Sequence, residues 1–143
     1  MKIYLASRYS RREEMLQVSK LLTELGHEVT SRWIHGSHEV PKDGLSVQYP
    51  TEFRQKFAAE DYEDLCRAEA TINFTEEPRA KNSRGGRHVE FGASLAMGQK
   101  LFVVGPRENV FHCLPQVQAF DTLEELIASG ELVPKLFESV LDP

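Results

Sequence analysis

Short apolar runs alternate with longer stretches of helical periodicity along most of the chain. Four runs have the length and composition of buried strands: Ile3–Leu5, Val29–Ile34, Ala70–Phe74 and Leu101–Val104. Val117–Phe120 is the candidate for a fifth strand. Because strands and helices alternate, the pattern predicts a mostly parallel sheet with helices on both faces, connected by right-handed crossovers.

Helical periodicity fills the intervals between these strands. Met15, Val18, Leu22 and Leu25 recur at spacings of three and four, and Gly26 ends that helix. The other predicted helices are Thr51 as N-cap to about Ala68, Arg87 to Met97 with Gly98 as the stop, Asp121 or Thr122 as N-cap to Ile127, and a short helix starting at Pro134. Residues 35–50 are expected to form a long loop.

Length and charge fit one domain spanning residues 1–143, since domains cluster near roughly 100 to 150 residues. The chain has 17 basic and 22 acidic side chains and a net charge of −5, so nucleic acid is not an expected partner. The N-terminal apolar run is too short for a signal peptide or a membrane span, and we expect a cytoplasmic protein with no membrane partner. Cys66 and Cys113 lack metal or redox spacing and are expected to be reduced thiols.

Ligands of parallel sheets bind beyond the carboxyl ends of the strands, which here nominates residues 7–12, 75–86 and 105–112. Several arginines fall in these segments: Arg8, Arg11, Arg12, Arg84 and Arg87. In an acidic protein this local excess suggests an anionic ligand such as a phosphate. For any single arginine, pairing with a nearby carboxylate such as Glu13 or Glu14 is the favoured interpretation.

Glu90 follows a glycine-rich turn, Ser83-Arg84-Gly85-Gly86-Arg87-His88-Val89-Glu90-Phe91-Gly92, which leads into a predicted helix. Paired glycines permit close backbone approach to a ligand, and the positive end of the helix dipole favours an ionised carboxylate in the first turn. An ionised, positioned carboxylate suits a covalent nucleophile. A capping role for Glu90 is the commoner explanation from position alone.

Asp61 interrupts an apolar helix face, because Phe53, Phe57, Asp61 and Leu65 recur every four residues. A carboxylate there is costly unless it is paired or lies at the mouth of a site. Since its neighbours are also acidic, a solvated face has about even odds. Two carboxylates in different environments are the usual equipment of retaining glycosyl transfer, with one as nucleophile and one as acid/base.

Asn109 and His112 lie just past a strand and could hydrogen-bond a sugar or phosphate, although His112 is equally suited to packing. His27, His35 and His38 show no metal-ligand spacing with nearby carboxylates, so no metal is expected, and no cofactor is expected either.

These residues together resemble the nucleoside 2-deoxyribosyltransferase family, including its 2′-deoxynucleoside 5′-phosphate N-hydrolase branch. The resemblance covers Met1 to about Phe120. It rests on the Ile3-Tyr4-Leu5 strand and the loop after it, the Asp of the helix before the third strand, the glycine-flanked Glu90 with Phe91-Gly92, and the closing apolar strand.

The resemblance implies a Rossmann-like or flavodoxin-like parallel sheet of five strands. It also implies that Glu90 forms a glycosyl-enzyme ester, that Asp61 shuttles the proton and that Tyr4 orients Glu90. The substrate-binding residues would be Ser7, Arg8, Ser10, Arg11, Arg84, Gly86, Arg87, His88 and Asn109. Asn109 would reach a neighbouring subunit's site, so a homodimer or larger homo-oligomer is expected. The basic character near Arg84 favours a nucleoside 5′-monophosphate as substrate.

The leading hypothesis is therefore cleavage or transfer at the N-glycosidic bond of a (2′-deoxy)nucleoside or its 5′-monophosphate. The alternative is a non-catalytic nucleotide-binding or sensor module on the same fold. A dinucleotide oxidoreductase is disfavoured, because no G-x-G-x-x-G follows the first strand.

Overall fold

The computed structural model describes residues 1–36, 50–77 and 85–132. Within these ranges, all the strands join one parallel sheet in the order β2-β1-β3-β4-β5. The strands are β1 (Lys2–Ala6), β2 (Glu28–Val29), β3 (Ala70–Phe74), β4 (Lys100–Val104) and β5 (Val117–Phe120). The predicted α/β fold, a Rossmann-like parallel sheet of five strands, is confirmed.

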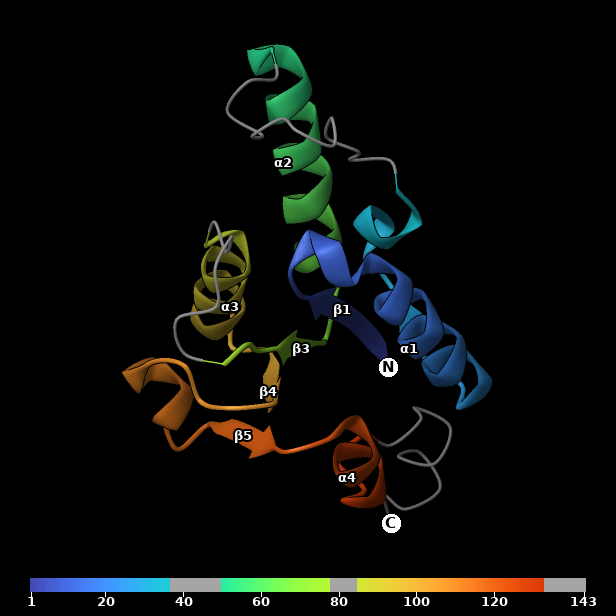
Figure 1. Cartoon of the computed structure of the whole chain (residues 1–143), viewed down its shortest axis with the longest axis vertical. Helices are drawn as coiled ribbons and strands as arrows, with labels where there is room; N and C mark the ends of the chain where they lie inside the picture. Colours follow the sequence, from blue (N-terminus) through green and yellow to red (C-terminus); the bar gives the residue numbers. More distant parts are fainter. Residues whose placement is uncertain (37–49, 78–84, 133–143) are drawn as a thin grey trace.

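Helices cover both faces of the sheet (Figure 1). They are α1 (Arg12–Glu24), α2 (Thr51–Cys66), α3 (Gly86–Ala96) and α4 (Leu123–Ala128). Apolar residues of α1, α2 and α4 pack with β1 and β3 in the larger core cluster, whereas Phe91 of α3 packs with Leu101, Val103 and Val117 in a smaller one. The result is a three-layer arrangement with α1 and α4 on one side of the sheet and α3 on the other.

The second strand is shorter than predicted. Pairing with β1 ends at Ile3 and Val29, and Arg32–His35 form a 3₁₀ helix in place of the end of a strand. Side chains of this segment bond the next backbone groups of β1: Leu5 N donates to Ser31 Oγ at 2.6 Å, and Trp33 Nε1 donates to the Leu5 carbonyl at 2.8 Å. Because those groups are satisfied by side chains, the strand ladder need not continue.

Helix α2 also differs from its prediction. Thr51 is its first residue and Pro50 holds the N-cap position without a side-chain hydrogen bond. The N-terminal half of α2 extends away from the sheet (Figure 1), and Phe53 is 52% exposed while Leu65 is buried. The stripe predicted as apolar therefore runs from solvent to core, and Asp61 lies half-buried, one turn before the buried Leu65.

The remaining helix ends agree closely with the sequence. Gly26 and Gly98 have left-handed φ angles of 92° and 71° just after α1 and α3. Thr122, rather than Asp121, caps α4, since its Oγ1 accepts from Glu125 N at 3.2 Å. The helix predicted at Pro134 and most of the predicted loop lie outside the described residues.

The strand order reverses between β1 and β3. From β1 the chain goes to β2 on one side, and β3, β4 and β5 then add on the other side. In open parallel sheets, this switch point is where ligands bind. Within the described residues, no helix is long and apolar enough to cross a membrane.

Candidate active site

Three side chains from different elements converge at the switch point. Tyr4 lies on β1, Asp61 on α2 and Glu90 on α3, and α3 packs against both α2 and β1. They are close enough to influence one another electrostatically: Asp61 and Glu90 both raise the pKa of Tyr4, and Asp61 raises that of Glu90. The predicted carboxylate pair thus lies in one place.

Glu90 favours its protonated form. Burial raises its pKa to about 8, the hydrogen-bonding interaction with Tyr4 opposes the rise, and the charge of Asp61 adds to it. The expectation that Glu90 lies in the first turn, where the helix dipole keeps it ionised, is therefore wrong: Glu90 is the fifth residue of α3, and the first turn contains no acidic residue. Desolvation of a carboxylate outweighs the dipole, which is worth only about 0.3 to 1 kcal/mol at most helix ends.

Tyr4 is fully buried, and burial followed by the charges of Glu90 and Asp61 raises its pKa well above the usual value, so its hydroxyl keeps its proton. Tyr4 Oη and Glu90 Oε2 are both inaccessible to solvent, and neither has a partner at ordinary hydrogen-bond geometry among the described residues. Their mutual effect on pKa indicates a longer contact. Buried polar atoms left open in this way are rare and mark places where a ligand can supply the partner.

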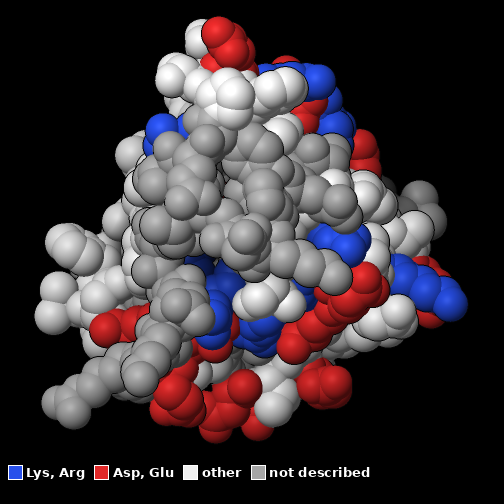
Figure 2. All heavy atoms as spheres, turned by 45° about the horizontal axis from the view of Figure 1, so that its top comes forward, with Lys and Arg blue, Asp and Glu red and all other residues white. Residues whose placement is uncertain are grey.

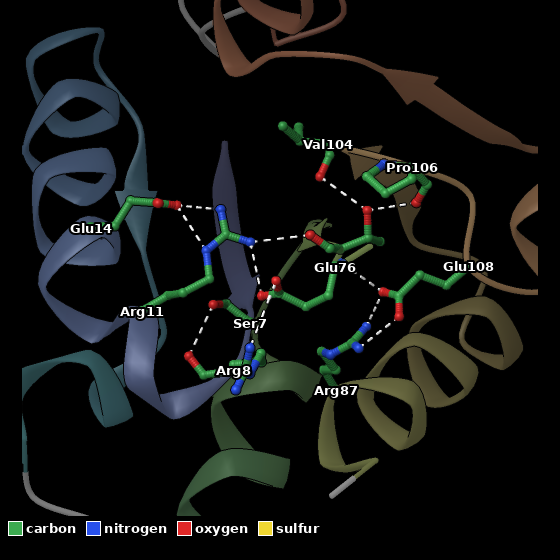
Figure 3. A network of polar contacts seen from close by, with 10 residues as sticks. Ser7, Arg8, Arg11, Glu14, Glu76, Arg87, Val104, Pro106 and Glu108 are labelled. Carbon is green, nitrogen blue, oxygen red and sulfur yellow. Dashed lines mark hydrogen bonds and ion pairs between the residues drawn. The ribbon is translucent and has the colours of Figure 1, made fainter. Parts of the chain in front are cut away.

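Arginines of the loop after β1 meet a carboxylate that follows β3 (Figure 3). Arg11 Nη1 lies 3.3 Å from Glu76 Oε1, and Arg8 Nη1 lies 3.9 Å from Glu76 Oε2. Arg11 also donates to the Thr75 carbonyl at 3.2 Å and pairs with Glu14. The carboxylate pairing that the sequence favoured for single arginines is present here, and Glu76 is its centre.

Arg87 forms a second ion pair next to this one. It is buried, and its guanidinium binds the Glu108 carboxylate through two nitrogens, one of them 2.8 Å from Glu108 Oε2. Glu108 Oε1 also accepts from Glu76 N at 2.9 Å. Burial by itself raises the pKa of Glu108, but the bonds from Arg87 and from the backbone of Glu76 lower it overall. The first turn of α3 is thereby tied to the loops after β3 and β4.

Gly105 brings these two loops together. Its φ of 115° is in the left-handed region, and a Cβ there would meet Thr75 Oγ1 at 2.6 Å. Thr75 Oγ1 donates to the Pro106 carbonyl at 2.6 Å across the same contact (Figure 3). The residue must therefore be glycine for the loop after β4 to lie against the end of β3.

A mainly apolar groove of about 470 Å³ lies between α3 and the 3₁₀ helix Val110–Cys113. His88 and Asn109 contribute polar groups to it, and it is otherwise lined by Phe91, Gly92, Leu95 and Phe111. Asn109 Oδ1 also caps the 3₁₀ helix by accepting from Phe111 N at 2.9 Å. His112 is buried with its ring 4.8 Å from that of Phe91 and its Nδ1 accepting from Glu108 N, which is the packing role considered for it.

The other predicted binding residues are distributed around the switch point. Ser7 is half-buried and donates to the Arg8 carbonyl at 3.0 Å, whereas Ser10 is exposed. Gly86 is the exposed first residue of α3. Arg84 lies outside the described residues. The binding roles of all these residues stay predictions.

Sequence reasoning missed three important carboxylates. Glu76 and Glu108 follow β3 and β4 in segments that the carboxyl-end rule had nominated, so attention to acidic as well as basic residues there would have found them. Asp64 is fully buried and binds Arg32, with Arg32 Nε 2.9 Å from its Oδ1.

Among the described residues, no group of three or more metal-ligating side chains gathers.

The fold and the carboxylate pair define a parallel-sheet α/β protein with a polar site at its switch point. A 2-deoxyribosyltransferase from Bacillus psychrosaccharolyticus has a similar structure, with a TM-score of 0.65 and 22% identity over 88% of this chain and 90% of its own. A CMP N-glycosidase from Clostridium botulinum is similar with a TM-score of 0.53 and 19% identity over 90% of this chain and 97% of its own. No family model and no curated protein matches the sequence. The predicted resemblance is confirmed at the level of the fold.

Proposed function

We propose that the protein cleaves or transfers the N-glycosidic bond of a (2′-deoxy)nucleoside or nucleoside 5′-monophosphate through a covalent glycosyl-Glu90 intermediate. The observation that carries the proposal is the half-buried pair of Asp61 and Glu90 beside the buried Tyr4 at the switch point. The two similar structures, a 2-deoxyribosyltransferase and a CMP N-glycosidase, support this bond as the target. Two carboxylates are the usual requirement for retaining glycosyl chemistry.

The raised pKa of Glu90 keeps a proton on its carboxyl group near neutral pH. Glycosyl transfer to Glu90 makes use of that proton. A Glu90 oxygen attacks C1′ of the sugar, the C1′–N bond breaks, and its electron pair stays on the base nitrogen. The proton that Glu90 gives up passes through Asp61 to the leaving base, which is a poor leaving group until it is protonated.

The second half of the reaction reverses these roles. Asp61 takes a proton from water or from the incoming base, that acceptor attacks C1′, and the ester bond to Glu90 breaks. The Tyr4 hydroxyl stays protonated and lies beside Glu90, so it donates to the carboxylate whenever Glu90 is ionised. Hydrolysis and transfer differ only in which acceptor reaches C1′.

The test is to incubate the protein with 2′-deoxynucleosides, ribonucleosides and their 5′-monophosphates, with and without a second free base, and to measure base release. We expect release with wild type, a loss of at least ~10³-fold with Glu90→Ala, and a mass adduct on Glu90 with a 2-fluoro sugar analogue. The value of kcat/KM should fall above about pH 8, where Glu90 loses its proton. Nucleotide binding without base release or adduct would support the sensor module instead.

We further propose a homo-oligomer as the working form. Asn109 and Phe111 line the groove beside α3, and Val89, Val110 and Phe111 are 73%, 78% and 59% exposed. Exposed apolar side chains gathered at a groove are typical of an interface. This supports the expectation that the loop containing Asn109 meets a neighbouring subunit, and the molar mass in solution tests it.

A further inference from the structure

Arg8 and Arg11 leave the carboxyl end of β1, and Glu76 follows that of β3, the adjacent strand across the switch point. The register pairs Ala6 with Asn73, so both loops begin at the same level of the sheet. Tyr4 lies two residues before the end of β1. The arginines and Glu76 therefore border the same end of the sheet as the carboxylate pair.

A continuous series of contacts joins this cluster to the first turn of α3, one turn before Glu90. The side chain of Glu76 binds Arg8 and Arg11, its backbone N–H binds Glu108, and Glu108 binds Arg87 (Figure 3). Arg87 and Glu90 lie one turn apart on α3. Contacts of both the side chain and the backbone of Glu76 thus fix its position relative to the reacting groups.

Among the described residues, the charges of the cluster cancel. Arg8 and Arg11 contribute two positive charges, and Glu76 with Glu14 contributes two negative ones. The side chains of Arg8, Arg11 and Glu76 are only 23%, 27% and 16% exposed, so solvent screens their pairing less than at an open surface. On the outer face of this end of the molecule, acidic atoms lie beside the basic ones (Figure 2). A phosphate entering here would have to displace a carboxylate that is already bound.

We propose that Glu76 is a specificity-determining residue whose carboxylate occupies Arg8 and Arg11 and makes the site select nucleosides without a 5′-phosphate. This rests on the proposed function and reverses the preference for a 5′-monophosphate that the basic loop residues suggested. Like charges brought together at an interface discriminate strongly against the wrong partner. A neutral 5′-hydroxyl meets no such repulsion and can donate a hydrogen bond to Glu76.

The experiment compares kcat/KM for 2′-deoxynucleoside 5′-monophosphates with kcat/KM for the matching 2′-deoxynucleosides. We expect a ratio below one for wild type. Glu76→Gln keeps the shape and an acceptor oxygen but removes the charge, and should raise the ratio about tenfold or more. Adding Arg11→Gln to Glu76→Gln should remove most of that gain, because the gain comes from the released guanidinium.

Glu13→Gln is the matched control. It removes the same charge from the same region, but Glu13 pairs with Arg12, and its side chain is 81% exposed. We expect it to change the ratio less than about twofold, as surface pairs are weak. A wild-type preference for the monophosphate, an unchanged ratio in Glu76→Gln, or an equal change in Glu13→Gln would each overturn the proposal.

Calorimetric titration with inorganic phosphate separates this inference from the proposed function. If no substrate releases its base, the proposed function fails, and phosphate binding alone decides the role of Glu76. Glu76→Gln should then bind phosphate about tenfold more tightly than wild type, and Glu13→Gln should not. Equal phosphate affinity in wild type and Glu76→Gln overturns the role of Glu76 whatever the activity.

Discussion

The Arg87–Glu108 pair and the site of Glu90 and Tyr4 both lie at the carboxyl end of the sheet. They differ in how far their polar atoms have hydrogen-bond partners. In the Arg87–Glu108 pair, hydrogen bonds hold the carboxylate in place and its pKa is lowered. At Glu90 the pKa is raised to about 8, and Glu90 Oε2 and Tyr4 Oη have no partner at ordinary geometry among the described residues. Both oxygens of the Glu108 carboxylate are bonded within the protein, whereas Glu90 Oε2 and Tyr4 Oη leave bonding capacity for a ligand.

This difference in hydrogen bonding and in pKa distinguishes a structural from a reactive carboxylate, whereas residue type alone does not. A bidentate arginine stabilises the ionised form of Glu108 and fixes its position. A buried carboxylate next to another acid, by contrast, holds its proton near neutral pH and can exchange it with a substrate. Substitutions at Asp61 and Glu90 should therefore chiefly lower the reaction rate. Substitutions in the Arg87–Glu108 pair should chiefly lower stability.

The largest effect is expected from Asp61→Asn. Asparagine keeps the size of the side chain but cannot shuttle the proton, so kcat/KM for natural nucleosides should fall about 10²–10⁴-fold. On an aryl 2-deoxyriboside, whose phenolate leaves without protonation, kcat/KM of the variant should fall much less. Measured rates on both substrates test this, and an equal loss on both would show that Asp61 has no acid role.

Glu63→Gln is the matched control for Asp61→Asn. Glu63 lies on the same helix and its side chain is 65% exposed, with an ion pair to Arg32 at 3.5 Å. Base release should be unchanged in this variant, because only a solvated charge is removed.

The second effect concerns stability. Arg87→Met leaves the Glu108 carboxylate in a largely buried position without its cation, which costs about 3–5 kcal/mol of unfolding free energy when a buried pair is broken. Adding Glu108→Gln removes the stranded charge and keeps an acceptor for Glu76 N, so the double variant should recover much of the loss. Urea unfolding of all three proteins measures this. A large KM change with unaltered stability in Arg87→Met would instead support the predicted substrate contact.

Much of the fold was predictable because apolar runs and punctuating glycines are local signals. Ala70–Phe74 and Val117–Phe120 match the observed strands residue for residue. The second strand was not predictable at its end, since the chain leaves the ladder where Ser31 and Trp33 side chains bond Leu5. Those are tertiary contacts between segments that are distant in the sequence, and no local pattern carries them.

The candidate site was predictable in its members but not in its electrostatics. Asp61 was identifiable as a carboxylate on an apolar stripe, and Glu90 as a carboxylate after a glycine-rich turn. The protonation state of Glu90 depends on how completely β1, α2 and α3 bury it, and the pairing of Arg8 and Arg11 depends on Glu76 across the sheet. Both properties arise from packing, so the dipole argument and the arginine count were each incomplete.

The smallest of the three effects is a pH-dependent stabilisation by Glu90→Gln. The pKa of Glu90 in the folded protein, about 8, exceeds its ordinary value of 4.5, so the native state binds the extra proton between these values. Stability contributed by protonated Glu90 is complete below about pH 4.5 and is lost as pH rises through about 8.

Gln resembles the protonated form at every pH, so the variant should be as stable as wild type near pH 4.5. Its free energy of unfolding should exceed that of wild type by about 2–3 kcal/mol near pH 9. This is less than the full pKa shift of Glu90 implies, because relaxation around the charge raises the effective dielectric constant. Thermal unfolding of both proteins from pH 4.5 to 9 measures the gap, and a gap that does not widen with pH would mean that Glu90 is ionised throughout, as Glu108 is expected to be.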